Sequence, residues 1–150
     1  MSSLAGKTIL MSGGSRGIGL AIALRAAADG ANIAMLAKTD TPHPKLEGTI
    51  HTAAEQIRAA GGNALAIVGD VRDDDDITEA VLKTQGEFGG IDIVINNASV
   101  IDLSTSLDLA AKKYDLMQDV NVRGTFMLSR AAVPQLREAA NPHILSLSPP

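Results

Sequence analysis

The chain has 150 residues, enough for one domain with a single core, and 45% hydrophobic with 20% charged residues is an ordinary globular composition. A formal net charge of −4 argues against nucleic acid or an anionic membrane as the main partner, and the absence of cysteine excludes disulfides and thiolate catalysis. No signal peptide pattern and no bilayer-long apolar stretch are found, so we expect a cytoplasmic protein that binds no membrane.

Short apolar runs alternate along the chain with longer stretches of helical period. Alternating strands and helices, with strands that are nearly continuous apolar runs, are typical of a parallel sheet covered on both faces, so the predicted fold class is α/β in one domain. The last helix is expected in two pieces, because Pro134 removes a backbone donor inside it. The predicted strands are residues 8–11, 32–37, 64–68, 91–95 and 143–147, and the predicted helices are residues 17–29, 49–60, 74–88 and 107–139.

The connection formed by residues 38–48 departs from this regularity. It is longer than the usual strand-to-helix connection of about 2–6 residues, and it contains Pro42, His43 and Pro44. We interpret it as a functional or ordered loop beside the second strand.

A glycine-rich turn joins the first predicted strand to the first predicted helix. Glycine permits the sharp turn and a close approach of ligand or backbone, and the free N–H groups and dipole of a helix N-terminus favour a pyrophosphate. A tight turn without a ligand is the alternative, but glycines at this junction, with a serine and an arginine among them, favour the ligand. The candidate binding residues are Gly13, Gly14, Ser15, Arg16, Gly17, Ile18 and Gly19.

The spacing Gly-x-x-x-Gly-x-Gly in this turn resembles the short-chain dehydrogenase/reductase family, rather than the Gly-x-Gly-x-x-Gly of ordinary dinucleotide folds. Similar proteins also place an Asp against adenine after the third strand, an Asn-Asn-Ala-Gly after the fourth, and a catalytic Asn in the long helix. The matching residues here are Asp70-Val71, Asn96-Asn97-Ala98-Ser99 and Asn121.

This resemblance implies a Rossmann-type doubly wound sheet of about five strands in the order 3-2-1-4-5, incomplete at the C-terminus. It also implies hydride transfer between nicotinamide and a carbonyl or alcohol substrate, and it adds Asp70, Val71, Asn97 and Ala98 to the cofactor-binding residues. A narrower likeness, to one particular member of the family, rests on residues 37–39, 42–46, 48–50, 52–55 and 148–150.

The end of the second predicted strand bears on the choice between NAD and NADP. NAD-preferring folds place an Asp or Glu there for the ribose hydroxyls, whereas this chain has Ala37 followed by Lys38. Lys38 can pair with a 2′-phosphate, and Arg16 offers a second cation with a planar fork. We therefore predict NADP, with NAD possible. Cations that are simply solvated are the alternative, and Asp40 would weaken the preference if it folded onto the ribose.

The family's proton donor is a Tyr in a Tyr-x-x-x-Lys helix, assisted by a Ser and by an Asn that holds a water. Tyr114 is the only tyrosine; it precedes Asn121 and is followed four residues later by Gln118, so the catalytic Tyr and Lys are expected beyond residue 150. The catalytic candidates in this chain are Asn121 and Ser148. Ser148 alternatively only ends a strand, because Pro149 occupies the place of the family's second serine.

No metal site is expected, because the three histidines are scattered and the acidic run at residues 73–76 suits a solvated helix start. Three hypotheses remain: an oxidoreductase active only when completed, a non-catalytic dinucleotide-binding fragment or module, and a different Rossmann-like protein such as a methyltransferase. The resemblance further implies a homodimer or homotetramer that pairs through the long helix. The substrate does not follow from the sequence.

Overall fold

The computed structural model describes residues 4–42 and 48–148 of the chain. Its strands are all parallel and form one sheet in the order β3-β2-β1-β4-β5, which confirms the predicted topology. Each observed strand begins and ends within two residues of its predicted bounds. The strands are β1 (Thr8–Ser12), β2 (Asn32–Ala37), β3 (Asn63–Val68), β4 (Ile93–Asn96) and β5 (His143–Ser146).

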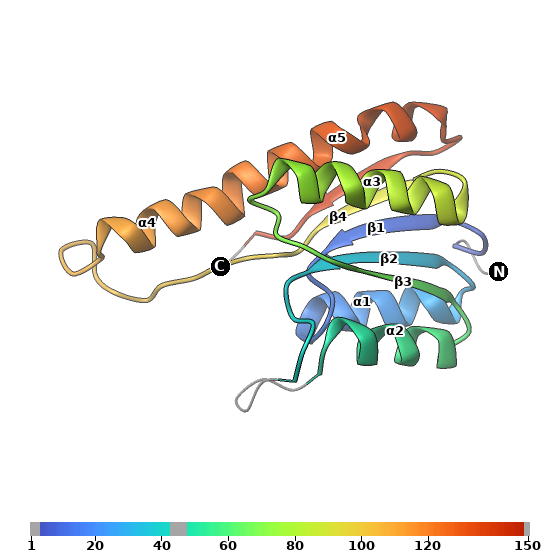
Figure 1. Cartoon of the computed structure of the whole chain (residues 1–150), viewed down its shortest axis with the longest axis horizontal. Helices are drawn as coiled ribbons and strands as arrows, with labels where there is room; N and C mark the ends of the chain where they lie inside the picture. The colour runs from blue at the N-terminus through green and yellow to red at the C-terminus, as the bar shows by residue number, and fades with distance from the viewer. Residues whose placement is uncertain (1–3, 43–47, 149–150) are drawn as a thin grey trace.

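Helices cover both faces of this sheet, as Figure 1 shows. On one face lie α1 (Gly17–Ala28) and α2 (Ile50–Ala59), and on the other lie α3 (Asp74–Phe88) and α5 (Thr125–Glu138). The helix α4 (Ala111–Met117) and the π-helical segment η1 (Gln118–Gly124) precede α5 directly. The three segments form one continuous helical column, of which the α4 end extends beyond the sheet. The arrangement is a Rossmann-like, doubly wound sheet.

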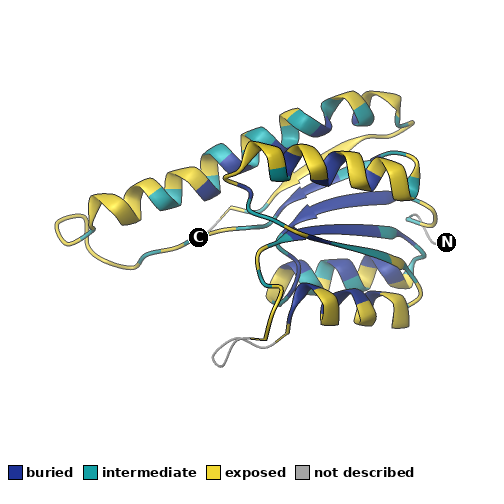
Figure 2. Cartoon of the chain, viewed as in Figure 1, coloured by how far each residue is buried: buried dark blue, intermediate teal, exposed yellow. Residues whose placement is uncertain are grey.

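The core is divided in two by the sheet, because successive side chains of a strand point to opposite faces. Ile9 and Met11 of β1 pack with α1 and α2, whereas Leu10 between them packs on the side of α3 and α5. The central strands are buried and the outer faces of the helices are exposed (Figure 2). β5 differs from the expected two-sided burial: all of its residues are exposed, including Ile144 and Leu145.

The prediction that Pro134 divides the last helix is wrong. Pro134 lies inside α5 at an exposed position, so the carbonyl that loses its N–H partner can be hydrated. The irregularity lies at η1 instead, where Gly124 packs on Val71 so closely that a Cβ would lie 3.0 Å from Val71 Cγ2. The helical column also begins at Ala111, later than the predicted residue 107.

The ends of the helices follow from local hydrogen bonds. Thr49 caps α2 with its side chain, and Asp73 caps α3 by accepting from the N–H groups of Asp75 and Asp76. The loop predicted at residues 38–48 is tied at its described ends, since Ile50 N–H donates to the Thr39 carbonyl at 2.9 Å. His43 and Pro44 lie outside the described residues. Among the described residues no helix is long and apolar enough to cross a membrane.

Candidate functional site

A cavity of about 480 Å³ opens at the carboxyl ends of the parallel strands, beside the switch point between β1 and β4. There the strand order reverses, with β2 and β3 on the far side of β1 and β5 on the far side of β4. This is the edge at which open α/β sheets bind ligands. Thr39, Arg72 and Ser99 also line the cavity, although no sequence pattern marked them as binding residues. The predicted residues that line it are Gly13, Gly14, Ser15, Arg16, Ile18, Lys38, Asp70, Val71, Asn97 and Ala98.

The glycines of the turn serve two different purposes. Gly17 does not line the cavity; it has a left-handed φ of +57° and a Cβ placed on it would meet nothing within 4 Å, so its backbone conformation and not its packing favours glycine. At Gly19 a Cβ would lie 2.5 Å from Asn97 Nδ2 and 2.8 Å from Gly14 Cα, so this glycine lets α1 pack against the turn. A Cβ on Gly13 would likewise lie 2.5 Å from Asn97 Nδ2. Close packing, more than ligand approach, therefore explains Gly13 and Gly19.

The N-terminus of α1 is open. Its N-cap residue, Arg16, makes no side-chain cap hydrogen bond, and the first turn contains no acidic residue. Arg16 instead donates from Nη2 to Thr39 Oγ1 at 2.8 Å, which places the guanidinium beside the end of β2. An uncapped helix N-terminus with a neighbouring cation fits a phosphate group.

The residues after β4 are held to the end of β1 by one hydroxyl. Ser12 Oγ accepts from the backbone N–H groups of both Asn97 and Ala98, at 3.2 Å each. Because Asn97 also contacts Gly13 and Gly19, the floor of the cavity is a single packed unit made from two strands far apart in the sequence.

Charges gather where the cavity reaches β2 and β3. Lys38 Nζ lies 3.1 Å from Asp70 Oδ2, and Arg72 Nη2 lies 2.6 Å from the same oxygen. The Arg72 guanidinium foremost, with help from Lys38, holds the pKa of the Asp70 carboxyl well below its ordinary value, against the opposing effect of partial burial. Asp70 is therefore ionised at neutral pH, and Lys38 is not simply solvated.

Asp40 is turned away from this charged end of the cavity. Its Oδ1 lies 2.6 Å from His51 Nε2, on the first turn of α2, and Asp40 does not line the cavity. The geometry in which Asp40 would face a ribose at the end of β2 is therefore not the one observed.

A second cavity, of about 330 Å³, adjoins the first at Ala98 and Ser99 and brings Asn121 and Ser148 together. Asn121, within η1, donates from Nδ2 to the Val100 carbonyl at 2.8 Å and accepts from the Val100 N–H at 2.9 Å. Its amide thus positions the chain after β4. Ser148 follows β5 at the rim of this cavity. Tyr114, on α4 and 52% exposed, does not line it.

The aspartates at residues 73–76 are used within the protein. Asp73 caps α3, Asp74 pairs with Arg123 at 2.8 Å, and Asp76 accepts from the Asp70 N–H at 2.8 Å. In the part of the chain that the structure describes, no three His, Asp or Glu residues are placed to hold a metal ion.

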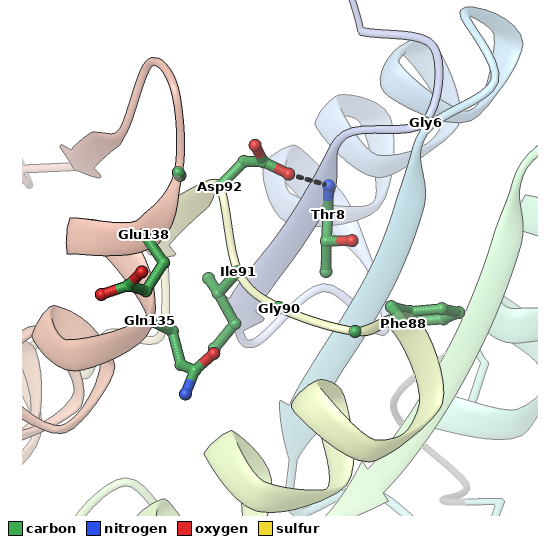
Figure 3. Close-up of a pocket in the computed structure, with 10 residues that line it drawn as sticks. Gly6, Thr8, Phe88, Gly90, Ile91, Asp92, Gln135 and Glu138 are labelled. Atoms are coloured by element: carbon green, nitrogen blue, oxygen red, sulfur yellow. Dashed lines mark hydrogen bonds between the residues drawn. The ribbon is translucent and has the colours of Figure 1, made fainter.

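Another hollow, of about 230 Å³, lies at the opposite edge of the sheet (Figure 3). There Asp92 accepts from the Thr8 N–H and pairs with Lys7, both at 2.9 Å, so its carboxylate fastens the start of β1. None of the predicted site residues lines this hollow.

Fold and site together define a Rossmann-like nucleotide-binding domain, with its glycine turn, helix N-terminus and ligand cavity at the switch point. The family described as short chain dehydrogenase matches residues 7–149, and the chain belongs to this family of oxidoreductases. The methyltransferase hypothesis is thereby set aside.

Known relatives agree with this assignment. The chain is 57% identical over 147 residues to hydroxysteroid dehydrogenase-like protein 2 of Bos taurus and 58% identical to the Mus musculus protein of that name, which confirms the narrower likeness expected from the sequence. These alignments cover 98% of the chain but only 35% and 30% of the relatives.

Solved structures show the same relation. A short chain dehydrogenase from Mycobacterium thermoresistibile superposes with a TM-score of 0.95 at 58% identity, over 99% of this chain and 53% of that one. An NADH-dependent reductase solved in complex with NAD superposes with a TM-score of 0.84 at 29% identity, over 97% of this chain and 60% of that one.

Proposed function

We propose that this chain is the cofactor-binding part of an NADP-dependent oxidoreductase, which transfers a hydride between nicotinamide and the carbonyl or alcohol carbon of a small-molecule substrate. The observation that carries the proposal is the open N-terminus of α1 next to Arg16, Lys38 and Arg72, with Asp70 as the one carboxylate among the described residues that line the cavity. The cofactor, when bound, supplies the hydride chemistry, and the protein orients it.

The described residues fit an NADP molecule in three places. The backbone amides at the N-terminus of α1, which receive no side-chain cap, would hold the diphosphate. Arg16 and Lys38 would pair with the 2′-phosphate, and Ala37 at the end of β2 offers no carboxylate to repel it. Asp70 and Val71 would lie against the adenine, as the resemblance to the family implies. This charge pattern supports NADP over NAD.

Beside the cofactor, the cavity shared by Asn121 and Ser148 would receive the reacting end of the substrate. We assign Asn121 to the proton relay, as a residue of η1 that fixes the backbone at Val100, and Ser148 to the substrate oxygen. The proton-donating Tyr and its Lys would come from residues beyond 150 in the complete protein. Residues 1–150 by themselves would then bind cofactor without turnover.

A second candidate function, dinucleotide binding without catalysis, is favoured by one observation: Tyr114 lies outside the cavity of Asn121 and Ser148. The complete coding sequence, together with an activity assay, would distinguish the two functions. A Tyr-x-x-x-Lys motif after residue 150, together with oxidation of NADPH by carbonyl compounds, supports the enzyme, whereas saturable binding without turnover supports the module.

The experiment is a titration of the full-length protein with NADPH and NADH, followed by cofactor fluorescence. We expect saturable binding, and we expect Lys38→Asp to weaken NADPH by about tenfold or more while NADH changes less, because only NADPH carries the 2′-phosphate. Lys83→Asp, on α3 and paired with Glu79, is the matched control. Absence of saturable binding contradicts the function, and equal losses for both cofactors show that Lys38 does not read the phosphate.

A further inference from the structure

We propose that Arg72 is a specificity-determining residue for the cofactor's 2′-phosphate: Arg72 favours binding of this phosphate although it does not contact it. Arg72 would stay paired with the Asp70 carboxylate when Lys38 moves away from that carboxylate to pair with the phosphate. The proposal rests on the NADP function proposed above, and it adds a residue from the β3–α3 connection to the two cations expected from the sequence.

Asp70 is held unequally by its two cations. Arg72 donates from Nε to both carboxylate oxygens, at 3.1 Å and 3.0 Å, and from Nη2 to Oδ2 at 2.6 Å. Its backbone N–H also donates to Oδ1 at 3.0 Å. Lys38 reaches only Oδ2, at 3.1 Å, and its side chain is 64% exposed. Arg72 is therefore the lasting partner of Asp70, and Lys38 is the one that can leave.

The carboxylate matters because it lines the same cavity as Lys38 and Arg16. A phosphate placed beside an ionised Asp70 is repelled unless another cation neutralises the carboxylate. When Lys38 swings its flexible stem to the phosphate, the fork of Arg72 stays on Asp70 and leaves a neutral pair behind. Without Arg72, the same movement would leave an unpaired negative charge next to the phosphate. A ligand without the phosphate makes no such demand.

Arg72 is itself held in place from η1. Arg123 donates from Nη1 to the Arg72 carbonyl at 2.9 Å and pairs through Nη2 with Asp74 at 2.8 Å. Gly124, the next residue, packs against Val71. The other charged groups that line a cavity beside Arg72 are Lys112, Lys113, Asp115 and Asp119 of α4 and η1, two of each sign, so they do not replace its charge.

The test compares ligands with and without the 2′-phosphate on the full-length protein by isothermal titration calorimetry: adenosine 2′,5′-bisphosphate against AMP, and NADPH against NADH. We expect Arg72→Gln to weaken binding of the ligand that carries the 2′-phosphate by roughly tenfold more than binding of the ligand that lacks it, in each pair. In an Asp70→Asn background, Arg72→Gln should change this discrimination little, because no carboxylate is left to neutralise. Arg25→Gln removes an arginine ion-paired to Asp29 on α1, and it is the control for net charge.

Each outcome decides the proposal. Equal weakening of both members of a pair, or unchanged discrimination, overturns the role of Arg72, as does a loss of the same size in the Asp70→Asn background. If Arg72→Gln does not fold, the comparison is made within the Asp70→Asn background and with Arg72→Lys, which keeps the charge and loses the fork and should discriminate at an intermediate level. A wild-type protein that binds dinucleotide but does not prefer the 2′-phosphate defeats the proposed NADP function instead.

Discussion

Gly19 stands at a position that no side chain can share. Its Cβ would meet Asn97 Nδ2 and the Gly14 backbone, and the Gly14 atoms cannot move without opening the turn. We expect Gly19→Ala to lower the free energy of unfolding by about 1–3 kcal/mol and to weaken dinucleotide binding, because α1 is pushed off the turn. Urea denaturation and cofactor titration measure the two effects.

The control for this change is Gly86→Ala. Gly86 lies in α3, where a Cβ would meet nothing within 4 Å, and its φ is not in the left-handed region, so alanine should stabilise the helix by about 0.5–1 kcal/mol. A Gly19→Ala protein as stable as the Gly86→Ala protein would contradict the packing role of Gly19.

Asp70 gives the fold a defined dependence on pH. Because Arg72 lowers the pKa of the folded-state carboxyl, ionised Asp70 contributes stability that is fully present above the ordinary Asp pKa of about 4 and is lost as the pH falls toward the depressed value. The difference in unfolding free energy between wild type and Asp70→Asn should therefore be constant from neutral pH down to about pH 5 and shrink below about pH 4. A difference that does not change on acidification would show that the Asp70 pKa is not lowered.

At the residue scale, the glycine turn and Lys38 could be identified from the sequence because each belongs to a short pattern along the chain. The partners of these residues could not. Lys38 follows β2 and Asp70 follows β3, and only the register of β2 against β3 brings the ends of those strands together. The positions of Thr39 and Arg72 likewise depend on long-range contacts, with Arg16 and Arg123 respectively, that no local pattern records.

Among the elements, η1 combines a rare helical geometry with a candidate catalytic residue, and π-helical turns are frequent at functional sites. Asn121→Ala removes two hydrogen bonds to Val100, which we expect to lower the unfolding free energy by about 2 kcal/mol. Asn141→Ala, at an exposed position before β5, should change it little. Equal stability of the two variants in urea denaturation would mean that the bonds to Val100 contribute nothing.

The strands were predictable because their apolar runs are short and bounded by turn residues, and the parallel order followed from the family resemblance. The π-helix was not predictable, since the contacts of its residues are tertiary: Gly124 packs on Val71 and Asn121 is hydrogen-bonded to Val100. The break expected at Pro134 does not occur because an exposed proline costs a helix less than a buried one, and the sequence alone did not show that Pro134 is exposed. The exposure of β5 was not predictable either, because it depends on which elements pack against the strand and not on the strand's own apolar sequence.

For the whole molecule, we propose a homodimer or homotetramer that pairs through α4, η1 and α5. Tyr114, Val122 and Phe126 on this column are more than half exposed, and large exposed apolar side chains are a feature of interfaces. We expect Phe126→Glu to weaken self-association of the full-length protein by about tenfold or more, measured by sedimentation equilibrium. Leu82→Glu, on α3 and similarly exposed, is the control. An unchanged association constant would exclude Phe126 from the interface.

The hydroxyl of Ser12, which binds the amides of Asn97 and Ala98, has a consequence for the order of folding. The hydrogen bond to Asn97 spans 85 positions, so a nascent chain that already carries the glycines still lacks the strand against which they pack. We expect tight dinucleotide binding to begin only once β4 has joined β1. The nucleotide would then bind late in folding and would stabilise only those molecules in which the centre of the sheet is already formed.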